Sequence, residues 1–533
     1  MSALVGTGAL IRLALRRDRV LLPVWVVCLA GVTVATGSAV GELYGTAESR
    51  ALLATTAGGN PAFLALLGPL HDSTTAGGLL AWRWGVFGSL LTALAAMSLV
   101  TRHTRAEEET GRLELLGATA IGRRAPLAAA VSVSALACAL IGAACALGLV
   151  GMGEGVAGSV AFGLGFAAVG LVFTAVGAVT AQLSATARTA NALAGGALGA
   201  AYLLRAVGDA AGERGPSWLT WLSPIGWFEQ LRPFAQERWW VLPLALGLAL
   251  ALVTGAWVLV ARRDLGGGLL PTRPGAARAP RSLGSALGLA WRLQRGMLLG
   301  WALGMFVLGG VYGAVARGVE EMLTSNPLLA QLIARMGGSG ALVDVYLASI
   351  LGVVGLFSAV YAVQAALRPR SEEIALRAEP VLATPVRRTR WVAGHLLFAT
   401  IGNAVVLAAA GLGAGLVHGL RVGDVGGQVA RLVGAALVHA PAAWVVAGLA
   451  LALFGLAPKL VPACWAVLVL LLVLGQLGPL LQLDRWAMDL SPFTHVPEVP
   501  GAEVSATPLV WLTVVAAALA AVGLLGFRRR DVG

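Results

Sequence analysis

The chain has 533 residues, of which 58% are apolar and only 12% are charged, and its mean hydropathy is +0.82. Charged residues make up about a quarter of an ordinary soluble domain, so this composition excludes a soluble globular protein. The formal net charge of +12 would suit a nucleic-acid-binding protein. The basic residues, however, cluster at the ends of apolar runs, as the positive-inside rule expects of a membrane protein. We therefore expect an all-α polytopic membrane protein.

Twelve apolar runs approach the length of about 20 residues that a transmembrane helix needs. The first half contains Val20–Val40, Leu79–Val100, Pro126–Val150, Val156–Thr180, Asn191–Val207 and Trp240–Ala261. The second half contains Met297–Val315, Val345–Leu367, Val392–Val417, Leu432–Leu456, Val461–Leu481 and Pro508–Phe527. The fifth run is short and is interrupted by Gly195 and Gly196.

A polar, charge-dense segment at residues 101–124 separates the second run from the third, and a second copy of it lies 265 positions later. The matched residues are Arg105 and Arg370, Glu107 and Glu372, Glu108 and Glu373, Arg112 and Arg377, Glu114 and Glu379, and Arg123 and Arg388. The two halves also end alike, with Arg262-Arg263-Asp264 after the sixth run and Arg529-Arg530-Asp531 after the twelfth. Such self-similarity indicates a tandem duplication.

Each half also begins alike, with a short segment that places apolar and basic residues at helical spacing. These segments are Leu10–Arg19 and Leu289–Arg295, and each predicts an amphipathic elbow helix lying in the membrane interface. We expect a first six-helix half at residues 1–264, a cytoplasmic linker rich in Gly, Pro and Arg at residues 265–285, and a second six-helix half at residues 286–533. Because each half holds an even number of spans, the halves are expected to be parallel repeats.

The distribution of basic residues predicts which side of the membrane each connection occupies. Most of the 38 Lys and Arg residues fall on the side that holds the N-terminus, which predicts that both termini and both charged segments are cytoplasmic. The connection Gly208–Trp239 then lies outside the cell, and it contains Trp218, Trp221 and Trp227. It is either an interfacial aromatic belt or a re-entrant or lid element over an exit path.

Sequence motifs for catalysis are missing. The only lysine, Lys459, lacks the glycines and the Ser or Thr of a phosphate-binding ATPase loop. The four cysteines lie inside apolar runs without the spacing of metal ligands. We therefore expect a transport subunit and not an enzyme, with no metal and no cofactor bound by this chain.

No Asp or Glu lies in the middle of any of the twelve runs, whereas ion-driven carriers mark their pathway with such residues. The most polar residues in or beside the runs are uncharged, namely Gln182, Asn191, Gln364, Asn403 and Gln476. We expect these side chains to join helices by hydrogen bonds. The pattern disfavours a proton-coupled carrier.

The duplicated segments resemble those of type-2 ABC transporter permeases, in particular the fused-duplicate membrane subunits of actinobacterial exporters for antibiotics and polyketides of the tetronasin kind. The resemblance rests on EEETGRLELLGATAIGRR and SEEIALRAEPVLATPVRR after the second and eighth runs, and on LSPIGW and LSPFTH before the last run of each half. It covers essentially the whole chain. It implies that each half has an elbow helix and six spans, and that the loop after the second span carries a coupling helix that meets a separate ATP-binding subunit.

The resemblance also assigns the ATPase-coupling residues. The first coupling element would comprise Glu107, Glu108, Gly111, Arg112 and Glu114, and the second Glu372, Glu373, Arg377 and Glu379. The second copy has Leu376, Pro380 and Pro385 where the first has Gly111, Leu115 and Ala120. The two docking sites are therefore expected not to be equivalent.

The function implied by this resemblance is ATP-driven export across the bacterial plasma membrane. Two copies of a separate ATPase would bind ATP and Mg²⁺ and drive the permease between inward-open and outward-open states. The cargo would be a hydrophobic or amphiphilic compound such as an antibiotic, a polyketide, a drug or a lipid. The expected substrate-cavity residues are Phe87, Asn191, Phe357, Tyr361 and Trp465.

Two other functions remain open. A twelve-helix secondary carrier would export drugs with a proton gradient, and ionophore-sensitive transport without an ATPase partner would favour it. A membrane-embedded lipid or glycan transferase would need a carboxylate or metal site near an interface. The acids expected outside, Glu42, Asp72, Asp344 and Glu498, form no recognisable pair.

Overall fold

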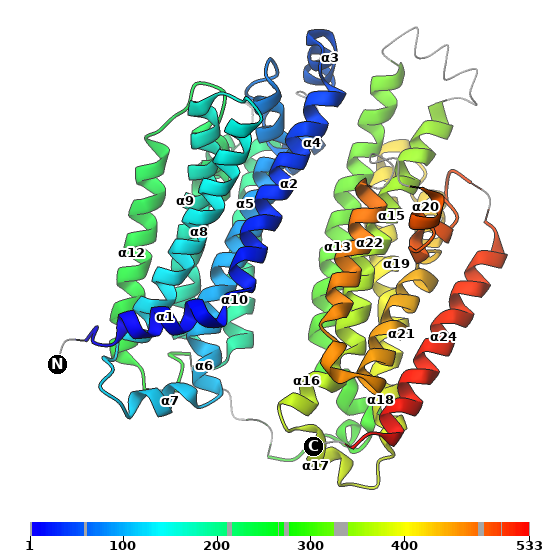
Figure 1. Ribbon diagram of the computed structural model, residues 1–533. Helices are drawn as coiled ribbons and strands as arrows, with labels where there is room; N and C mark the ends of the chain where they lie inside the picture. The colour runs from blue at the N-terminus through cyan, green and yellow to red at the C-terminus, as the bar shows by residue number, and fades with distance from the viewer. Residues whose placement is uncertain are drawn as a thin grey trace. The chain divides into compact units, whose positions relative to one another are not determined.

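The computed structural model describes residues 3–57, 61–210, 216–264, 266–270, 275, 277–324, 339–477, 484–502 and 504–531. Throughout these ranges every regular element is a helix (Figure 1), so the prediction of an all-α protein is confirmed. The chain divides into two compact units, Met1–Gly275 and Ala276–Gly533. The division falls inside the stretch expected to be a linker.

Long helices make up most of the first unit. They are α2 (Leu21–Leu43), α5 (Ala76–His103), α8 (Ala125–Gly151), α9 (Val156–Leu183), α10 (Ala187–Ala210) and α12 (Val241–Arg262). The largely buried α9 contacts α5, α8, α10 and α12. A Cβ atom at Gly163 would lie 2.2 Å from the carbonyl oxygen of Gly142 in α8, so the glycines allow these two helix backbones to pack closely.

The short helices of the first unit lie at the ends of the long ones. They are α1 (Thr7–Arg17), α3 (Ala47–Ala57), α4 (Pro61–Leu67), α6 (Arg105–Glu109), α7 (Arg112–Gly117), η2 (Ser217–Leu222) and α11 (Pro224–Leu231). The amphipathic α1 crosses the ends of the long helices (Figure 1), with Ile11 and Leu15 packed on the unit and Arg12 and Arg16 exposed. It occupies the position of the first expected elbow helix, whose place in the membrane interface stays a prediction.

The second unit is built in the same way. Its longer helices are α13 (Ala286–Thr324), α15 (Ser339–Ala366), α19 (Asn403–Val422), α20 (Val425–Leu437), α21 (Ala440–Leu456), α22 (Ala463–Leu477) and α24 (Ala506–Arg529). Its shorter ones are η3 (Arg281–Gly284), α16 (Arg368–Ile374), α17 (Ala378–Leu382), α18 (Arg388–Leu397), the π-helical turn η4 (Phe398–Gly402), η5 (Pro458–Leu460), α23 (Arg485–Met488) and η6 (Pro492–His495). A Cβ atom at Gly413 of α19 would lie 2.0 Å from the carbonyl oxygen of Phe306 in α13, so close glycine packing recurs.

The elbow of the second unit differs from the prediction. Residues Leu289–Arg295 are not a separate helix but belong to the first turns of the continuous helix α13. In the first unit α1 ends before Asp18, whose buried carboxylate pairs with Arg102 of α5 at 3.0 Å. Pro23 then follows in the first turn of α2. The segment around Arg295 lacks both the proline and the buried acid, so nothing in it interrupts the helix.

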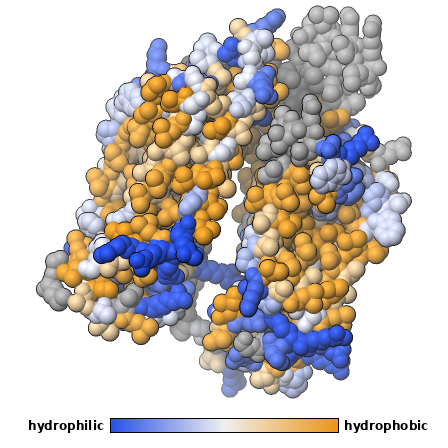
Figure 2. All heavy atoms as spheres, in the orientation of Figure 1, coloured by the Kyte–Doolittle hydropathy of each residue, from blue (hydrophilic) through white to orange (hydrophobic). Residues whose placement is uncertain are grey.

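Ten helices in the described part of the chain are long and apolar enough to cross a bilayer, and they coincide with ten of the twelve predicted runs. The fifth run forms α10, which carries Arg188, Arg205 and Asp209 and is less apolar than the ten. The eleventh forms the shorter α22, and its last residues, 478–481, lie outside the described residues. In each unit apolar side chains cover the long helices and polar ones gather toward the helix ends (Figure 2). Such a surface belongs to an integral membrane protein.

Candidate functional site

The charged loop of the first unit connects α5 to α8 and folds as two short helices joined by a turn. Glu107 and Glu108 occupy the first turn of α6, where acidic side chains interact favourably with the helix dipole. Gly111 adopts a left-handed conformation with φ +70° and so reverses the chain between α6 and α7. Leu113 of α7 is buried, whereas Glu114 is exposed.

The charged loop of the second unit connects α15 to α18 and repeats this fold with α16 and α17. Leu376 stands where the first loop has Gly111, and it adopts the same left-handed conformation with φ 55°. A residue with a Cβ atom pays roughly 1–2 kcal/mol for this conformation. The backbone of the turn is therefore conserved between the loops even though the sequence expectation treated this position as a difference.

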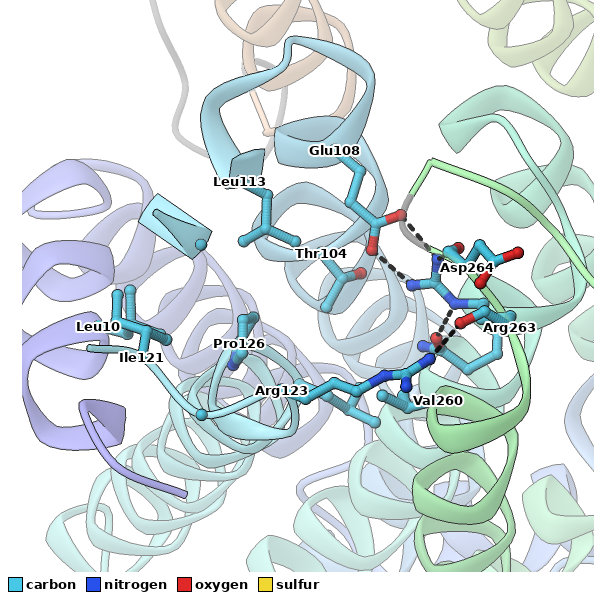
Figure 3. A pocket seen from close by; sticks show the side chains of 14 residues that line it. Leu10, Thr104, Glu108, Leu113, Ile121, Arg123, Pro126, Val260, Arg263 and Asp264 are labelled. Carbon is cyan, nitrogen blue, oxygen red and sulfur yellow. Dashed lines mark hydrogen bonds and ion pairs between the residues drawn. The ribbon is translucent and has the colours of Figure 1, made fainter. Parts of the chain in front are cut away.

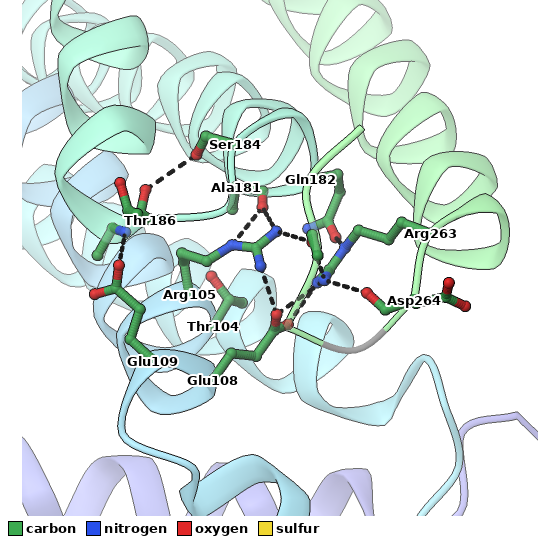
Figure 4. A network of polar contacts seen from close by, with 12 residues as sticks. Thr104, Arg105, Glu108, Glu109, Ala181, Gln182, Ser184, Thr186, Arg263 and Asp264 are labelled. Atoms are coloured by element: carbon green, nitrogen blue, oxygen red, sulfur yellow. Dashed lines mark hydrogen bonds and ion pairs between the residues drawn. The ribbon is translucent and has the colours of Figure 1, made fainter. Parts of the chain in front are cut away.

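Glu108 anchors the first loop to the end of the last long helix of its unit. Its Oε2 atom accepts hydrogen bonds from Arg263, which follows α12, at 2.8 Å and from Arg105 at 2.7 Å (Figure 4). The buried Arg105 guanidinium also donates to the carbonyl oxygen of Ala181 at the end of α9. Arg263 in turn donates to Gln182 Oε1 at 2.7 Å. The loop, α9 and α12 are thus joined by one carboxylate between two guanidinium groups.

Glu373 anchors the second loop to the end of its own last helix. It forms an ion pair with Arg530, which follows α24, and Arg530 occupies the position that matches Arg263. A second contact also recurs, because Arg388 donates to the carbonyl oxygen of Arg530 at 2.6 Å and Arg123 donates to that of Arg263 at 2.5 Å. Both units therefore tie the charged loop to their final long helix through residues at matching positions.

The other two inward acids, Glu107 and Glu372, each pair with the arginine at the matching position of their loop, Arg112 at 3.8 Å and Arg377, but their second partners differ. Glu107 pairs with Arg17 of α1 at 2.7 Å, so it connects the first loop to the amphipathic helix. Glu372 pairs with Arg368 at 2.6 Å and Arg377 at 2.8 Å, both in its own loop. Burial acts to raise the pKa of Glu372, but the hydrogen bonds and charges of Arg377 and Arg368 lower it below its usual value. The carboxylate form therefore holds the second loop together.

The remaining expected coupling residues lie at the surface of the loops. Arg112, Glu114, Arg377 and Glu379 are exposed. Beside them lie three exposed apolar side chains, Leu115 (76% exposed), Ile374 (70%) and Leu376 (67%). The sequence reasoning did not count these three as coupling residues, although apolar residues in a charge-dense loop are a visible signal. The expected set thus divides into an anchoring group and an exposed group, and its coupling role stays a prediction.

A cavity of about 440 Å³ lies beneath the first loop (Figure 3). Apolar side chains from α1, α7 and the start of α8 form one wall, among them Leu10, Leu113 and Pro126, and Arg263 and Glu108 lie on another (Figure 3). The first loop is therefore not fully packed against the helices beneath it.

The expected substrate-cavity residues have different environments in the structure. Asn191, Phe357 and Trp465 are exposed, and Phe87 is half-buried. Tyr361 is fully buried, and its hydroxyl donates to the carbonyl oxygen of Phe398 in η4 at 3.2 Å, so it joins α15 to the π-helical turn. A role of these five residues in a substrate cavity stays a prediction.

Sequence reasoning missed a buried charge cluster in the first unit, formed by Arg205, Asp209 and Glu229. Glu229 belongs to α11, in the connection read as an aromatic belt or a lid. The exposed Trp218, Trp239 and Trp240 suit a belt, whereas α11 itself packs inward. The spacing of Arg205 and Asp209, four residues apart on one helix, was the available signal.

The sequence matches a family described as "Multidrug efflux system permease Rv1217c, C-terminal domain" over residues 9–261 and 283–528. It is also 46% identical over 534 residues to the multidrug efflux system permease protein Rv1217c of Mycobacterium tuberculosis (strain ATCC 25618 / H37Rv). That alignment covers 100% of this chain and 96% of the relative.

Proposed function

This chain belongs to the multidrug efflux system permease family, and from that premise we propose that it is the membrane-spanning subunit of an ATP-driven ABC exporter. In this proposal α10 and α22 complete twelve spans in the bacterial plasma membrane, with both termini in the cytoplasm. Two copies of a separate ATPase subunit bind ATP and Mg²⁺. The cargo is a hydrophobic or amphiphilic compound: an antibiotic, a polyketide, a drug or a lipid.

The observation that carries this proposal is the repeated architecture of the two charged loops. Each loop exposes a short helix or turn with acidic and apolar side chains, as a docking surface for a soluble partner requires. Each is also anchored to the last long helix of its unit by the matching ion pairs Glu108–Arg263 and Glu373–Arg530. A displacement of the loop by a partner would therefore act directly on a long helix of the same unit.

ATP binding can drive transport only if the ATPase binds the two states of the permease with different affinity. We propose that the exposed residues around Glu114 and Glu379 supply the contacts that differ between these states. In this proposal the ion pairs Glu108–Arg263 and Glu373–Arg530 hold each loop in shape, so that the binding energy moves the whole loop instead of deforming it.

The test is to purify the affinity-tagged chain gently from its native host and to identify the proteins that accompany it. We expect a separate ATPase to co-purify with the natural chain and to be lost from the double variant Glu114→Arg, Glu379→Arg. The control is Glu48→Arg, which reverses an exposed acid in α3, away from both loops. Recovery of the same ATPase with the double variant would refute the assigned docking surface.

One observation favours a second candidate, the proton-coupled carrier. Asp209 of α10 and Glu229 of α11 both have buried carboxyl groups. Carriers usually bind protons through such buried carboxyl groups. Recovery of the chain without any ATPase, together with transport that stops when an ionophore collapses the proton gradient, would establish the carrier and exclude the ABC permease.

A further inference from the structure

One buried arginine faces two buried carboxyl groups in the first unit. Arg205 of α10 lies 2.7 Å from Glu229 Oε1 in α11 and 3.4 Å from Asp209 Oδ2, four residues further along its own helix. The side chains of Arg205, Glu229 and Asp209 are 0%, 5% and 4% exposed. Two carboxylates beside one guanidinium would leave a net negative charge out of contact with water, which is strongly unfavourable.

Within the part of the chain that the structure describes, the other hydrogen bonds of the cluster bring no second positive charge to the two carboxyl groups. Arg205 donates its remaining hydrogen bonds to the carbonyl oxygens of Ala65 and Leu66 at the end of α4. The Thr220 hydroxyl donates to Asp209 Oδ1 at 2.7 Å. The ring of Tyr202 packs against the guanidinium, 4.8 Å from it.

Two carboxyl oxygens in this cluster lack a donor. Glu229 Oε2 and Asp209 Oδ2 are buried and accept no hydrogen bond from any described N–H or O–H group, and the two carboxyl groups face the same nitrogen of Arg205, at 2.7 Å and 3.4 Å. One proton between them would satisfy both oxygens and cancel the excess charge. Two carboxyl groups that share a site take up a proton in this way.

We propose that Asp209 and Glu229 form a proton-binding site, in which one proton shared by Asp209 Oδ2 and Glu229 Oε2 keeps α11 packed into the first unit. The helix α11 packs closely on α9: the ring of Phe228, next to Glu229, contacts Phe162 edge-on and Phe166 at a tilt, with ring centroids 5.4 Å and 5.3 Å away. Loss of the proton places two like charges behind this helix. The site therefore converts proton release into loosening of α11.

Glu229 borders a space in which a water molecule could exchange a proton with it. A cavity of about 20 Å³ borders Glu229, which is enough for one water molecule. His71, Asp72 and Arg232 also line this cavity. Burial, followed by the charges of Arg232 and Arg238, lowers the pKa of His71 to about 4, so His71 is neutral near pH 7 and does not compensate a second carboxylate. Asp72 is occupied by hydrogen bonds from Thr74 and Thr75.

The direction of the pH dependence follows from burial. Burial raises the pKa of Glu229 well above its usual value. A carboxyl group whose pKa is raised in the folded protein stabilises the packed state fully when the pH is below the pKa of a free carboxyl group. This stabilisation is lost as the pH rises through the raised pKa. The contacts of α11 should accordingly weaken as the pH rises through the raised pKa of Glu229.

The site lies at the end of the unit opposite the charged loop. The first turn of α10 is held by Glu109 of that loop, which accepts a hydrogen bond from Ala187 N at 2.9 Å. From there α10 runs 24 residues, or about 36 Å at 1.5 Å per residue. In the orientation of the proposed function, which has the charged loops in the cytoplasm, the proton would be exchanged with the exterior; the site itself does not depend on that orientation.

Infrared spectroscopy of the purified protein in lipid nanodiscs tests the proposal. We expect the natural chain to show a protonated-carboxyl band that persists above the pH at which free carboxyl groups ionise and disappears as the pH is raised further. Glu229→Gln and Asp209→Asn should each lose that band, and the control Glu48→Gln, which changes an exposed acid, should keep it. Two separate variants keep the test decisive where one of them fails to fold.

Hydrogen exchange of the α11 peptide provides the second readout. In the natural chain, protection of α11 should fall with rising pH by more than the chemical exchange rate explains, whereas in Glu229→Gln it should not. Equal pH profiles in both proteins, or a band that both variants retain, would overturn the proposal. So would a band abolished at neutral pH by Na⁺ but not by K⁺, because the occupant would then be sodium and not a proton. These readouts require no transport and stand apart from the proposed function.

Discussion

The role of Glu108 in the fold is set by the two arginines that it contacts. Glu108 is the only carboxylate that the described structure places against both Arg105 and Arg263, and the side chains of all three are at most 8% exposed. Glu114, six residues later in the same loop, is exposed. The sequence predicts both acids to be coupling residues, but their environments differ: Glu108 holds the loop in place, whereas Glu114 faces the solvent.

Replacement of Glu108 by Gln should destabilise the protein strongly. The change leaves two buried guanidinium groups without their carboxylate, and breaking a buried pair costs about 3–5 kcal/mol. Glu114→Gln is the matched control, since a substitution at the surface changes stability by only about 0.5 kcal/mol or less. Thermal unfolding in detergent measures both. Equal melting temperatures for the two variants would contradict the anchoring role.

The turn between the two short helices of each loop is the element that sets the direction of the exposed helix. Gly111 and Leu376 share its left-handed conformation, although only glycine adopts it without cost. In the first loop the turn is free of crowding, because a Cβ atom at Gly111 would meet nothing within 4 Å. The conformation of the backbone alone therefore decides the effect of a substitution there.

Gly111→Ala should lower the stability of the first loop by about 1 kcal/mol, the cost of a left-handed alanine. The control is Gly117→Ala at the end of α7, where a Cβ atom also meets nothing within 4 Å and φ is not positive. There alanine should leave stability unchanged or raise it slightly, since it favours the helix. Hydrogen exchange of the loop peptides distinguishes the two variants. If both substitutions changed the stability of the loop in the same direction, the left-handed turn at Gly111 would not be what determines the effect.

At the scale of the whole molecule, the chain contains two units with the same anchored loop. The anchors match closely, through Glu108–Arg263 in one unit and Glu373–Arg530 in the other. The exposed surfaces differ, because Leu115 accompanies Glu114 in the first loop whereas Ile374 and Leu376 accompany Glu379 in the second. Under the proposed function, each loop holds one ATPase copy, and the two copies are held by different contacts.

Single charge reversals should separate the two docking sites. We expect Glu114→Arg and Glu379→Arg each to reduce the bound ATPase from two copies to one, because each loop contributes its own surface. Native mass spectrometry of the purified complex gives the number of copies, and Glu48→Arg should retain both. Complete loss of the ATPase in one single variant would show instead that this loop controls assembly and that the two sites do not act independently.

The sequence by itself determined the class of protein, ten of the spanning helices and the repeated loop. A bilayer imposes a minimum length and a low charge on each span, and both can be read residue by residue. For the same reason the fifth run was the weakest prediction, and its helix α10 carries Arg205 and Asp209. The eleventh run was predicted at full length, whereas the described part of α22 has only 15 residues.

Only the tertiary structure decided which charges are buried and what they contact. The run of acids Glu107, Glu108 and Glu109 looks uniform in the sequence, yet each faces a different partner. Glu229 meets Arg205 because α11 turns inward and packs Phe228 against α9. The physical reason is that a span is defined by its own composition, whereas the partner of a buried charge is set by the packing of elements far apart in the chain.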